Sequence, residues 1–291
     1  MSLQHNPLKI IVTGAGGLVG GCLSRRFARR GDNVLALRRA DLDVTDGAAV
    51  ERIFLSERSQ LVVNCTVIGV DECERDPAAA HAINVEAPRS LARASLEAGA
   101  EFLHFSTNYV FDGRRRGIDY IAEDEPHPLN VYGRTKLEGE RAAREANPRT
   151  YVVRTSWVFG EGKSSFLSTA HRELSAGRRV RAIKDTWASV TYVEDLARRV
   201  EEILARRRYG LYQVVNTGVC TYEDFANEAA RLAGLSEGEA ARLIETVSEA
   251  DMRRAAPRPQ YTPMRCLLSA QLGLAPLRDW RAALAEYVAQ E

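Results

Sequence analysis

The sequence predicts an α/β protein with a doubly wound, mostly parallel sheet and a smaller C-terminal lobe. Three observations predict this fold. Short apolar runs alternate with longer helical patterns, a glycine-rich loop follows the first run directly, and the alternation fades after about residue 156. Continuous apolar strands separated by helices are typical of parallel sheets that helices cover on both faces.

The strands are expected at five apolar runs, which are residues 10–12, 34–37, 61–63, 102–105 and 151–153. Asp76 and Pro77 are typical of an N-cap and a first helical position, and Gly99 is expected to end that helix. The predicted alternation of strands and helices is therefore supported by residues that start and end a helix.

Two later helices are predicted from their capping boxes. Thr191 precedes Glu194 by three residues, and Thr221 precedes Asp224 by the same spacing. In a capping box the hydroxyl and the carboxylate each accept a backbone N–H at the helix start. We therefore expect helices that begin directly after Thr191 and Thr221.

The composition argues against several classes of protein. Forty Lys and Arg residues against 39 Asp and Glu residues give a formal net charge of +1, so nucleic acid and anionic membranes are not expected partners. Five scattered cysteines without a C-x-x-C pair predict neither a disulfide framework nor a thiolate zinc site. The N-terminal residues lack the regions of a signal peptide, and no apolar run approaches membrane-spanning length, so we expect a cytoplasmic protein with a small-molecule partner.

The first motif with chemistry is a glycine-rich loop between the first strand and the first helix. Its residues are Gly14, Gly16, Gly17, Leu18, Val19 and Gly20. Glycines here let the turn tighten, bring backbone N–H groups near a pyrophosphate, and let the helix pack close to the sheet. Glycine strings also form plain turns, but the strand before and the helix after favour a dinucleotide site of the Rossmann type.

The end of the second strand indicates which dinucleotide binds. Arg38 and Arg39 stand where an NAD-preferring site usually carries an acidic residue. A guanidinium can meet the 2′-phosphate of NADPH with paired hydrogen bonds, so NADPH is expected, with NADH as the alternative. The other interpretation is that both arginines only face water. Asp43 and Val44 are expected near the adenine edge.

Tyr132 and Lys136 form the strongest candidate catalytic pair. Their i, i+4 spacing places them on one face of a predicted helix. A carbonyl reductase needs a proton donor, and lowering the tyrosine pKa from about 10 to about 7 requires about 4 kcal/mol. One positive charge at about 4 Å supplies about that much at an effective dielectric of 20. By itself the Y-x-x-x-K spacing is common, but its place after a nucleotide loop favours general acid chemistry.

Thr107 lies at the predicted carboxyl end of a parallel strand, where ligands of doubly wound sheets collect. Its hydroxyl is expected to bond the carbonyl of a substrate. The alternative is that Ser106 and Thr107 only satisfy the backbone of a turn.

Four segments together resemble the dTDP-4-dehydrorhamnose reductase family of extended short-chain dehydrogenases/reductases. They are VTGAGGLVG, FSTNYVFDG, PLNVYGRTKLEGE and RTSWVFG. The similarity covers roughly the whole chain and is dense through Gly160. The resemblance implies an NADPH-dependent 4-ketoreductase of a 4-keto-6-deoxysugar linked to a nucleotide, expected to be dTDP.

The resemblance also implies roles for individual residues. Thr107, Tyr132 and Lys136 would be the catalytic triad, and Lys136 would also bind the nicotinamide ribose. Asn64, Cys65 and Thr66 would line the cofactor, and residues 154–157 would border the nicotinamide and the sugar. The substrate would meet Thr107, Asn108, Tyr109, Trp157, Trp187 and Arg258. Residues 1–156 with 188–217 would then bind the cofactor, and residues 157–187 with 218–291 the substrate.

The chain departs from the family pattern at several positions. Asn108 replaces the usual Asp, Thr66 and Val67 replace small residues, and the segment 184–191 lacks the usual Q-x-G and the proline before threonine. Cys22 stands where some relatives carry a glutamate linked to a metal-bridged dimer, so no such metal is expected. The acid-base pair of related dehydratases is missing after Thr107, which favours reduction over elimination.

Two other functions stay open from the sequence. The methionine adenosyltransferase beta subunit resembles the chain in the same motifs, so a non-catalytic nucleotide-binding regulatory subunit is one alternative. A reductase or epimerase with a different substrate is the other, suggested by the altered segment 184–191. The sequence does not determine the oligomeric state, and a homodimer stays open.

Overall fold

The structure is a computed structural model that describes residues 6–162 and 164–291. Its contacts divide the chain into two compact units. The first unit runs to Thr107 and includes Val131–Arg154 and Leu204–Tyr212, and the second contains Asn108–Asn130, Thr155–Ile203 and Gln213–Glu291. The units are of similar size, so the second is not the smaller lobe that the sequence predicts. Residues 108–130 enlarge it, and their loop-like sequence gave no sign of this.

The first unit is built on a six-stranded sheet with the order β10-β5-β4-β3-β1-β2. β1 is parallel to β2 and to β3, and β3 is parallel to β4. The strands are β1 (Lys9–Thr13), β2 (Asn33–Leu37), β3 (Leu61–Asn64), β4 (Glu101–Thr107), β5 (Thr150–Thr155) and β10 (Gly210–Gln213). The predicted α/β fold and all five predicted strands are confirmed.

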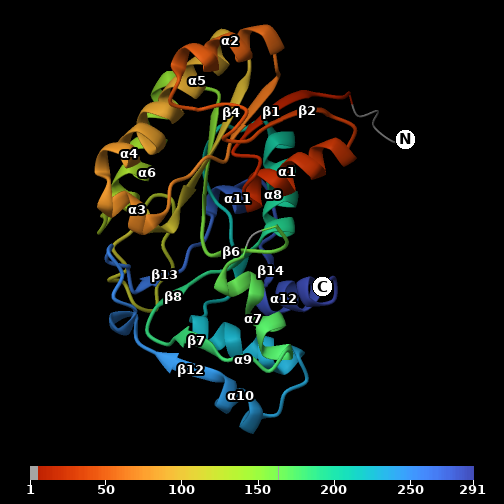
Figure 1. The fold of residues 1–291 in the computed structure, drawn as a ribbon. Helices are drawn as coiled ribbons and strands as arrows, with labels where there is room; N and C mark the ends of the chain where they lie inside the picture. Colours follow the sequence, from red (N-terminus) through yellow and green to blue (C-terminus); the bar gives the residue numbers. More distant parts are fainter. Residues whose placement is uncertain (1–5, 163) are drawn as a thin grey trace. The chain divides into compact units, whose positions relative to one another are not determined.

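Helices cover both faces of this sheet. α1 lies on one face, and α2, α5 and α6 lie on the other, with α5 packed between α2 and α6 (Figure 1). The elements are α1 (Leu18–Arg29), α2 (Gly47–Glu57), α3 (Val70–Arg75), α4 (Pro77–His81), a π-helical turn η1 (Ala82–Glu86), α5 (Ala87–Glu97) and α6 (Val131–Ala146). Asp76 caps α4 by accepting from Ala79 N, as predicted.

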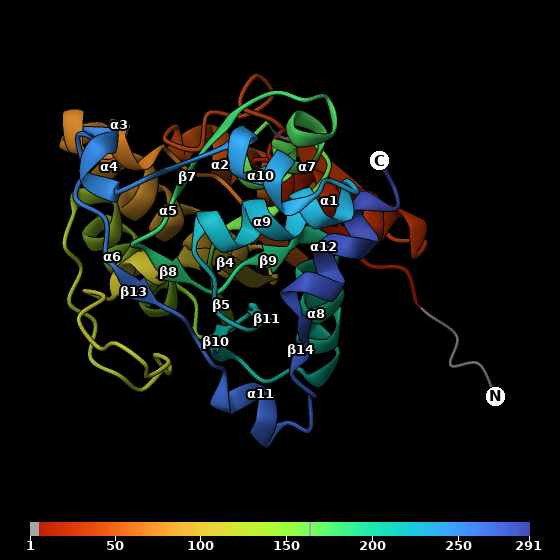
Figure 2. The ribbon, with the colours of Figure 1, turned by 90° about the horizontal axis from the view of Figure 1, so that it is seen from below.

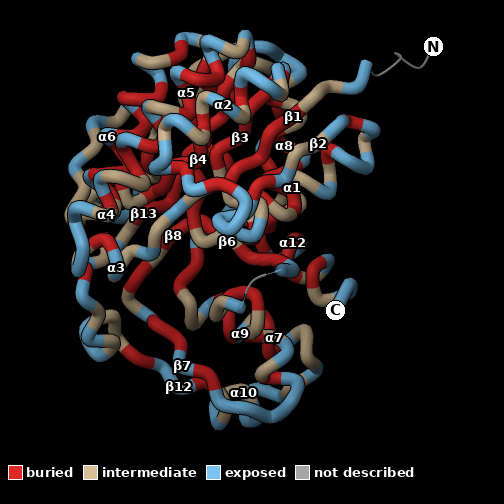
Figure 3. Tube along the Cα trace, turned by 45° about the horizontal axis from the view of Figure 1, so that its top comes forward, coloured by how far each residue is buried: buried red, intermediate tan, exposed pale blue. Residues whose placement is uncertain are grey.

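The central strands are buried because helices lie on both sides of them. β3 and β5 are buried at every residue, whereas the edge strand β2 is partly exposed. The same contrast is visible along the chain trace, where β1, β3 and β4 are mostly red (Figure 3). The core of the α2 and α5 face includes Ile11, Phe54, Val62, Leu91 and Phe102.

The second unit combines short parallel strand pairs with helices. The pairs are β6–β9, β7–β12, β8–β13 and β11–β14. α9 packs against α7, α10 and α12 (Figure 2). The strands are β6 (Val158–Phe159), β7 (Val180–Ile183), β8 (Trp187–Ala188), β9 (Thr191–Tyr192), β11 (Asn216–Thr217), β12 (Ile244–Val247), β13 (Tyr261–Thr262) and β14 (Leu277–Asp279).

The helices of this unit are mostly short. α8 begins here and ends within the first unit. The helices are the 3₁₀ turn η2 (Asn108–Val110), α7 (Phe166–Ser175), α8 (Val193–Arg206), α9 (Tyr222–Leu232), α10 (Glu237–Leu243), the 3₁₀ turn η3 (Glu249–Met252), α11 (Leu267–Gln271) and α12 (Trp280–Val288). None of the helices in the described part of the chain is long and apolar enough to cross a membrane.

One of the two predicted capping boxes is confirmed. Thr221 and Asp224 exchange their hydrogen bonds at the start of α9. Thr191 lies in β9, where its hydroxyl donates to Ser156 O at 2.7 Å, and the helix expected after it, α8, begins at Val193.

Candidate functional site

The glycine loop has the tight geometry that close approach of a ligand requires. Gly14 has φ +69°, and a Cβ there would lie 2.7 Å from the backbone of Cys65. A Cβ on Gly20 would lie 2.4 Å from Gly14 O, so α1 packs directly on the loop. The N-cap of α1 is Gly17, and no side chain therefore covers the first-turn N–H groups. These groups are oriented as in a helix N-terminus that binds a phosphate.

A cavity of about 240 Å³ opens beside this loop. It is lined by Gly14, Gly16, Gly17, Arg39, Leu42, Asp43, Val44, Cys65, Thr66, Val67 and Ile83. Eight of these residues are among the predicted cofactor residues, so the structure gathers them around one space. Leu42, Val67 and Ile83 were not predicted, because isolated apolar residues give no binding signal in a sequence.

Seven predicted cofactor residues do not line this cavity, and two of them are Tyr132 and Lys136 on α6. Leu18 and Gly20 are buried in α1, Val19 follows Leu18 in the first turn, and Asn64 is buried at the end of β3. The last, Arg38, is described next.

The two arginines after β2 have different surroundings. The Arg38 side chain is 72% exposed, and its Nε lies 3.5 Å from a carboxylate oxygen of Asp41. Its aliphatic part lies over Gly16, where a Cβ would meet Arg38 Cγ at 3.5 Å. Arg39 lines the cavity. The structure therefore separates two residues that the sequence treats as equivalent.

Asp43 is an anion held by its own turn. Its Oδ1 accepts from Thr45 N at 2.9 Å and from Thr45 Oγ1 at 2.7 Å. The backbone hydrogen bond from Thr45 is the largest cause that lowers the pKa of Asp43. Asp43 thus offers a fixed carboxylate at the cavity wall.

The candidate catalytic residues of the first unit lie on α6 and at the carboxyl end of β4. Lys136 is 2% exposed, and its Nζ donates to Phe105 O at 2.6 Å. Phe105 precedes Thr107 by two residues on β4, and Tyr132 lies one helical turn before Lys136. The first turn of α6 is held by Val131 N, which donates to a Glu74 carboxylate oxygen at 3.0 Å. One buried hydrogen bond therefore ties the helix of the predicted pair to the strand that ends in Thr107.

Burial changes the proton affinity of the lysine. Desolvation lowers the pKa of Lys136 to about 8, against the opposing effect of the Glu140 charge. Lys136 is thus an ammonium below about pH 8 and an amine above it.

Glu140 and Arg154 form a buried ion pair next to this site. Arg154 donates through Nε and Nη2 to the two Glu140 oxygens at 2.8 Å and 2.7 Å, and Ser106 Oγ donates to the same carboxylate. The sequence placed Arg154 beside the nicotinamide and sugar. In the structure its guanidinium bonds to Glu140. The sequence analysis did not select Glu140, because a glutamate eight residues after Tyr132 on the same helix matches no catalytic or binding motif.

The second unit holds the other predicted substrate residues. Tyr109 shares a hydrogen bond with Arg258, and both lie near Tyr222. The Tyr222 ring packs against the Trp157 ring at a tilt of 34°, with 4.1 Å between centroids, and Trp157 has the unusual φ of 42°. The structure thus brings three predicted residues together with Tyr222, which sequence reasoning missed.

Asn108 and Trp187 have partners along the β8–β13 pair. Asn108 Nδ2 donates to Thr262 Oγ1 at 2.7 Å, and Trp187 pairs with Tyr261 in the strand register. The Arg116 guanidinium lies over the Trp187 ring at 5.3 Å from its centroid. Asn108 is therefore engaged within its own unit.

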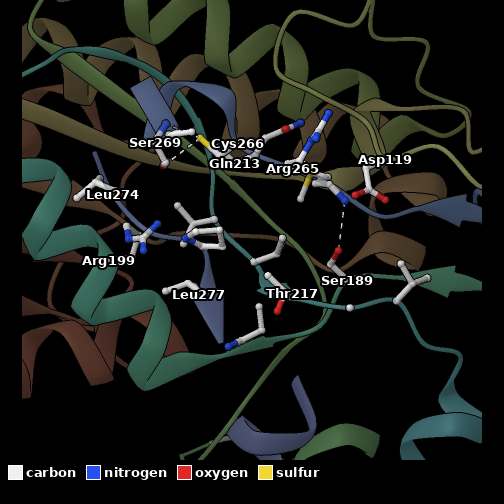
Figure 4. A pocket seen from close by; sticks show the side chains of 18 residues that line it. Asp119, Ser189, Arg199, Gln213, Thr217, Arg265, Cys266, Ser269, Leu274 and Leu277 are labelled. Carbon is white, nitrogen blue, oxygen red and sulfur yellow. Dashed lines mark hydrogen bonds between the residues drawn. The ribbon is translucent and has the colours of Figure 1, made fainter. Parts of the chain in front are cut away.

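A further cavity of about 280 Å³ lies inside the second unit (Figure 4). Its labelled walls include Arg199, Gln213, Cys266 and Leu277, and the hydroxyl of Ser189 accepts from Met264 N at 3.2 Å. No predicted substrate residue is among its lining residues. This cavity is distinct from the candidate site.

Within residues 6–162 and 164–291, no three His, Cys, Asp or Glu side chains gather as metal ligands. Cys22 is buried in α1 at 1% exposure.

The fold and this site define an extended short-chain dehydrogenase/reductase: a doubly wound sheet, a glycine loop before α1, and a Tyr and Lys pair on α6. The family model described as "RmlD substrate binding domain" matches residues 8–291, and the chain belongs to this family. The resemblance stated from the motifs is confirmed.

Relatives and solved structures agree with this assignment. The dTDP-4-dehydrorhamnose reductase of Mycolicibacterium smegmatis is 39% identical over 97% of this chain and 85% of its own length. That of Streptomyces griseus is 41% identical over 95% and 91%. The crystal structure of dTDP-4-dehydrorhamnose reductase from Bacillus anthracis in complex with NADP has a TM-score of 0.91, 28% identity, and covers 98% of this chain and 100% of that chain.

Proposed function

We propose that the protein reduces the 4-keto group of a nucleotide-linked 4-keto-6-deoxysugar with NADPH, with dTDP as the expected nucleotide. The observation that carries the proposal is the buried Lys136, one turn after Tyr132 on α6 and bonded to the strand that ends in Thr107. The relatives named dTDP-4-dehydrorhamnose reductase support the choice of substrate. A cytoplasmic location and a homodimer stay predictions from the sequence.

The residues of the first unit fit a dinucleotide. Gly14, Gly16 and Gly17 line the cavity without side chains, so the loop backbone is bare where a pyrophosphate would approach, and Arg39 provides a cation at the same cavity. The NADP complex of the Bacillus anthracis relative supports NADPH as the cofactor. When bound, NADPH supplies the hydride that reaches the carbonyl carbon.

The chain's own residues handle the proton and the orientation of the substrate. Tyr132 donates its hydroxyl proton to the carbonyl oxygen, and Thr107 orients that oxygen by a hydrogen bond. Lys136 holds positive charge beside Tyr132 and is expected to bind the ribose of the cofactor. In the second unit, Tyr109, Trp157 and Arg258 are proposed to hold the sugar nucleotide, with Arg258 facing the diphosphate and Asn108 and Trp187 contributing nearby.

The test measures the loss of NADPH absorbance with a panel of dTDP-4-keto sugars. Turnover of at least one of them supports the proposal. NADPH binding without turnover of any would indicate the non-catalytic regulatory subunit instead, and turnover of only unrelated ketones would indicate a different substrate.

Tyr132→Phe provides the matching variant. Because general acid catalysis contributes about 10²–10⁴-fold, kcat is expected to fall by about that factor, while the NADPH dissociation constant stays within about twofold. Tyr209→Phe removes the same atom from a hydroxyl that donates to Glu101 at 3.1 Å, and serves as the control. Turnover of Tyr132→Phe within about tenfold of the unmodified protein would rule out the proton-donor role.

A further inference from the structure

A chain of buried hydrogen bonds leads from the glycine loop to the candidate catalytic lysine. Thr13 Oγ1 donates to Asn64 Oδ1 at 3.0 Å, Asn64 Nδ2 lies 3.1 Å from His104 Nδ1, and His104 Nε2 lies 3.4 Å from Lys136 Nζ. Asn64, His104 and Lys136 are each at most 2% exposed. The residues come from the ends of β1 and β3, from β4, and from α6, all in the first unit.

The orientation of Asn64 fixes which ring nitrogen of His104 accepts. Thr66 N lies 3.0 Å from Asn64 Oδ1, and a backbone N–H can only donate, so the oxygen of this amide is on the Thr66 side. The NH₂ group therefore faces His104 Nδ1. An amide NH₂ only donates, so His104 Nδ1 accepts, and a neutral ring then carries its proton on Nε2. Burial lowers the pKa of His104 well below its usual value, which keeps the ring neutral.

The Nε2–H group of His104 points at Lys136, and this matters for the charge of the lysine. An ammonium has three donors and no acceptor, whereas an amine has a lone pair. Facing a ring N–H at 3.4 Å, only the amine can accept, and its own N–H can still donate to Phe105 O. The network therefore favours the neutral form of Lys136.

We propose that His104 is a positioning residue that stabilises the neutral amine of Lys136 and thereby sets how readily this lysine releases a proton to Tyr132. The inference rests on the proposed function for the identity of the proton acceptor. In the step, the Nζ–H bond of Lys136 breaks and the Oη–H bond of Tyr132 forms. This transfer neutralises both the lysine ammonium and the tyrosine phenolate that the reaction leaves. His104 keeps its Nε2 proton and donates it in a hydrogen bond to the lone pair formed on Lys136 Nζ.

The other titratable groups around Lys136 act in known directions. Burial lowers its pKa most, the charge of Glu140 on the same helix raises it, and the Cys65 and Cys73 thiols raise it by smaller amounts. Glu140 is neutralised by Arg154, and burial raises the thiol pKa values of both cysteines. Against this background the contact from His104 is the one that a single substitution removes cleanly.

The first experiment reads the ring proton directly. The chain has five histidines, so ¹⁵N NMR of the labelled protein can resolve each ring, with His104→Gln identifying the signal of His104. The expected result is a protonated Nε2 and an unprotonated Nδ1. A proton on Nδ1 would overturn the proposal, whatever the protein's activity.

The second experiment compares His104→Leu with His104→Gln. Gln offers an oxygen to Asn64 and an N–H to Lys136, whereas Leu offers neither. The pKa of Lys136, followed by ¹³C NMR of its side chain, is expected to rise by about half to one unit in His104→Leu and to stay near the unmodified value in His104→Gln. The basic limb of the pH profile of kcat/KM is expected to move by the same amount.

The titration of Lys136 and the measurement of turnover distinguish a failure of this inference from a failure of the proposed function. An unchanged Lys136 titration in a folded His104→Leu protein that still binds NADPH would overturn the role of His104. Absence of any turnover in the unmodified protein would refute the proposed function, while the lysine titration would still decide the inference. If His104→Leu does not fold, the tautomer of the unmodified protein decides it alone.

Discussion

Lys136 meets two requirements that oppose each other. Its positive charge favours proton donation by Tyr132, and the sequence-based estimate of about 4 kcal/mol assumes that this charge is complete. Its burial lowers its pKa to about 8, so the charge decreases as the pH rises through that value. The electrostatic help to Tyr132 is therefore fully present below about pH 8 and is lost above it.

Arg39 and Arg38 also have to be considered separately. A hydrogen bond to a charged group contributes about 1.5 to 3 kcal/mol. Arg39→Asp removes a cation from the cavity wall and adds repulsion toward a 2′-phosphate, so the preference for NADPH over NADH, expected to be about tenfold or more, should invert. The measurement is the ratio of the two dissociation constants at fixed low salt.

Arg38→Asp is the matched comparison for this prediction. Its guanidinium is largely in water and lies near Asp41, so a smaller change in the ratio is expected. Equal binding of both cofactors in the unmodified protein, unmoved by either substitution, would mean that both arginines only face solvent.

At the scale of the element, α1 depends on its close approach to the glycine loop. In Gly20→Ala the new Cβ would lie 2.4 Å from Gly14 O, so the loop or the helix must shift. We expect NADPH affinity to fall by at least about tenfold, because the first-turn N–H groups would no longer point at the pyrophosphate. Gly21→Ala meets its nearest atom at 3.3 Å and is the control. Equal affinities of the two variants in a fluorescence titration would contradict this account.

α6 depends on the ion pair between Glu140 and Arg154. Glu140→Gln leaves a buried guanidinium without its counter-charge, which typically costs about 3–5 kcal/mol. The free energy of unfolding from urea titration is expected to fall by that amount. Glu138→Gln changes an exposed residue of the same helix and is expected to stay within about 0.5 kcal/mol. A similar stability of both variants would show that Arg154 finds another partner.

For the whole molecule, the proposed cofactor should act as a stabilising ligand. NADPH at a hundred times its dissociation constant is expected to raise the free energy of unfolding by about 2.7 kcal/mol. Calorimetry should show the shift in the transition of the first unit, which contains the cavity and the glycine loop. A shift of the same size in Gly20→Ala would place the binding elsewhere.

Much of the fold could be predicted because its strands and helix caps depend on residues that are close together in the sequence. Apolar runs buried on both faces mark β1, β3, β4 and β5, and the Asp76 and Thr221 caps bond to groups within three residues. Residues 108–130 joined the second unit through contacts that no local pattern contains.

The sequence by itself determined the α/β fold, the glycine loop and the spacing of Tyr132 and Lys136, because strand, turn and helix periodicities depend on neighbours along the chain. Tertiary structure decided the rest of the candidate site. Arg39 rather than Arg38 lines the cavity, and His104 lies against Lys136 although 32 residues separate them. Burial and hydrogen-bond direction depend on groups that are distant in sequence, and these set the charge of Lys136.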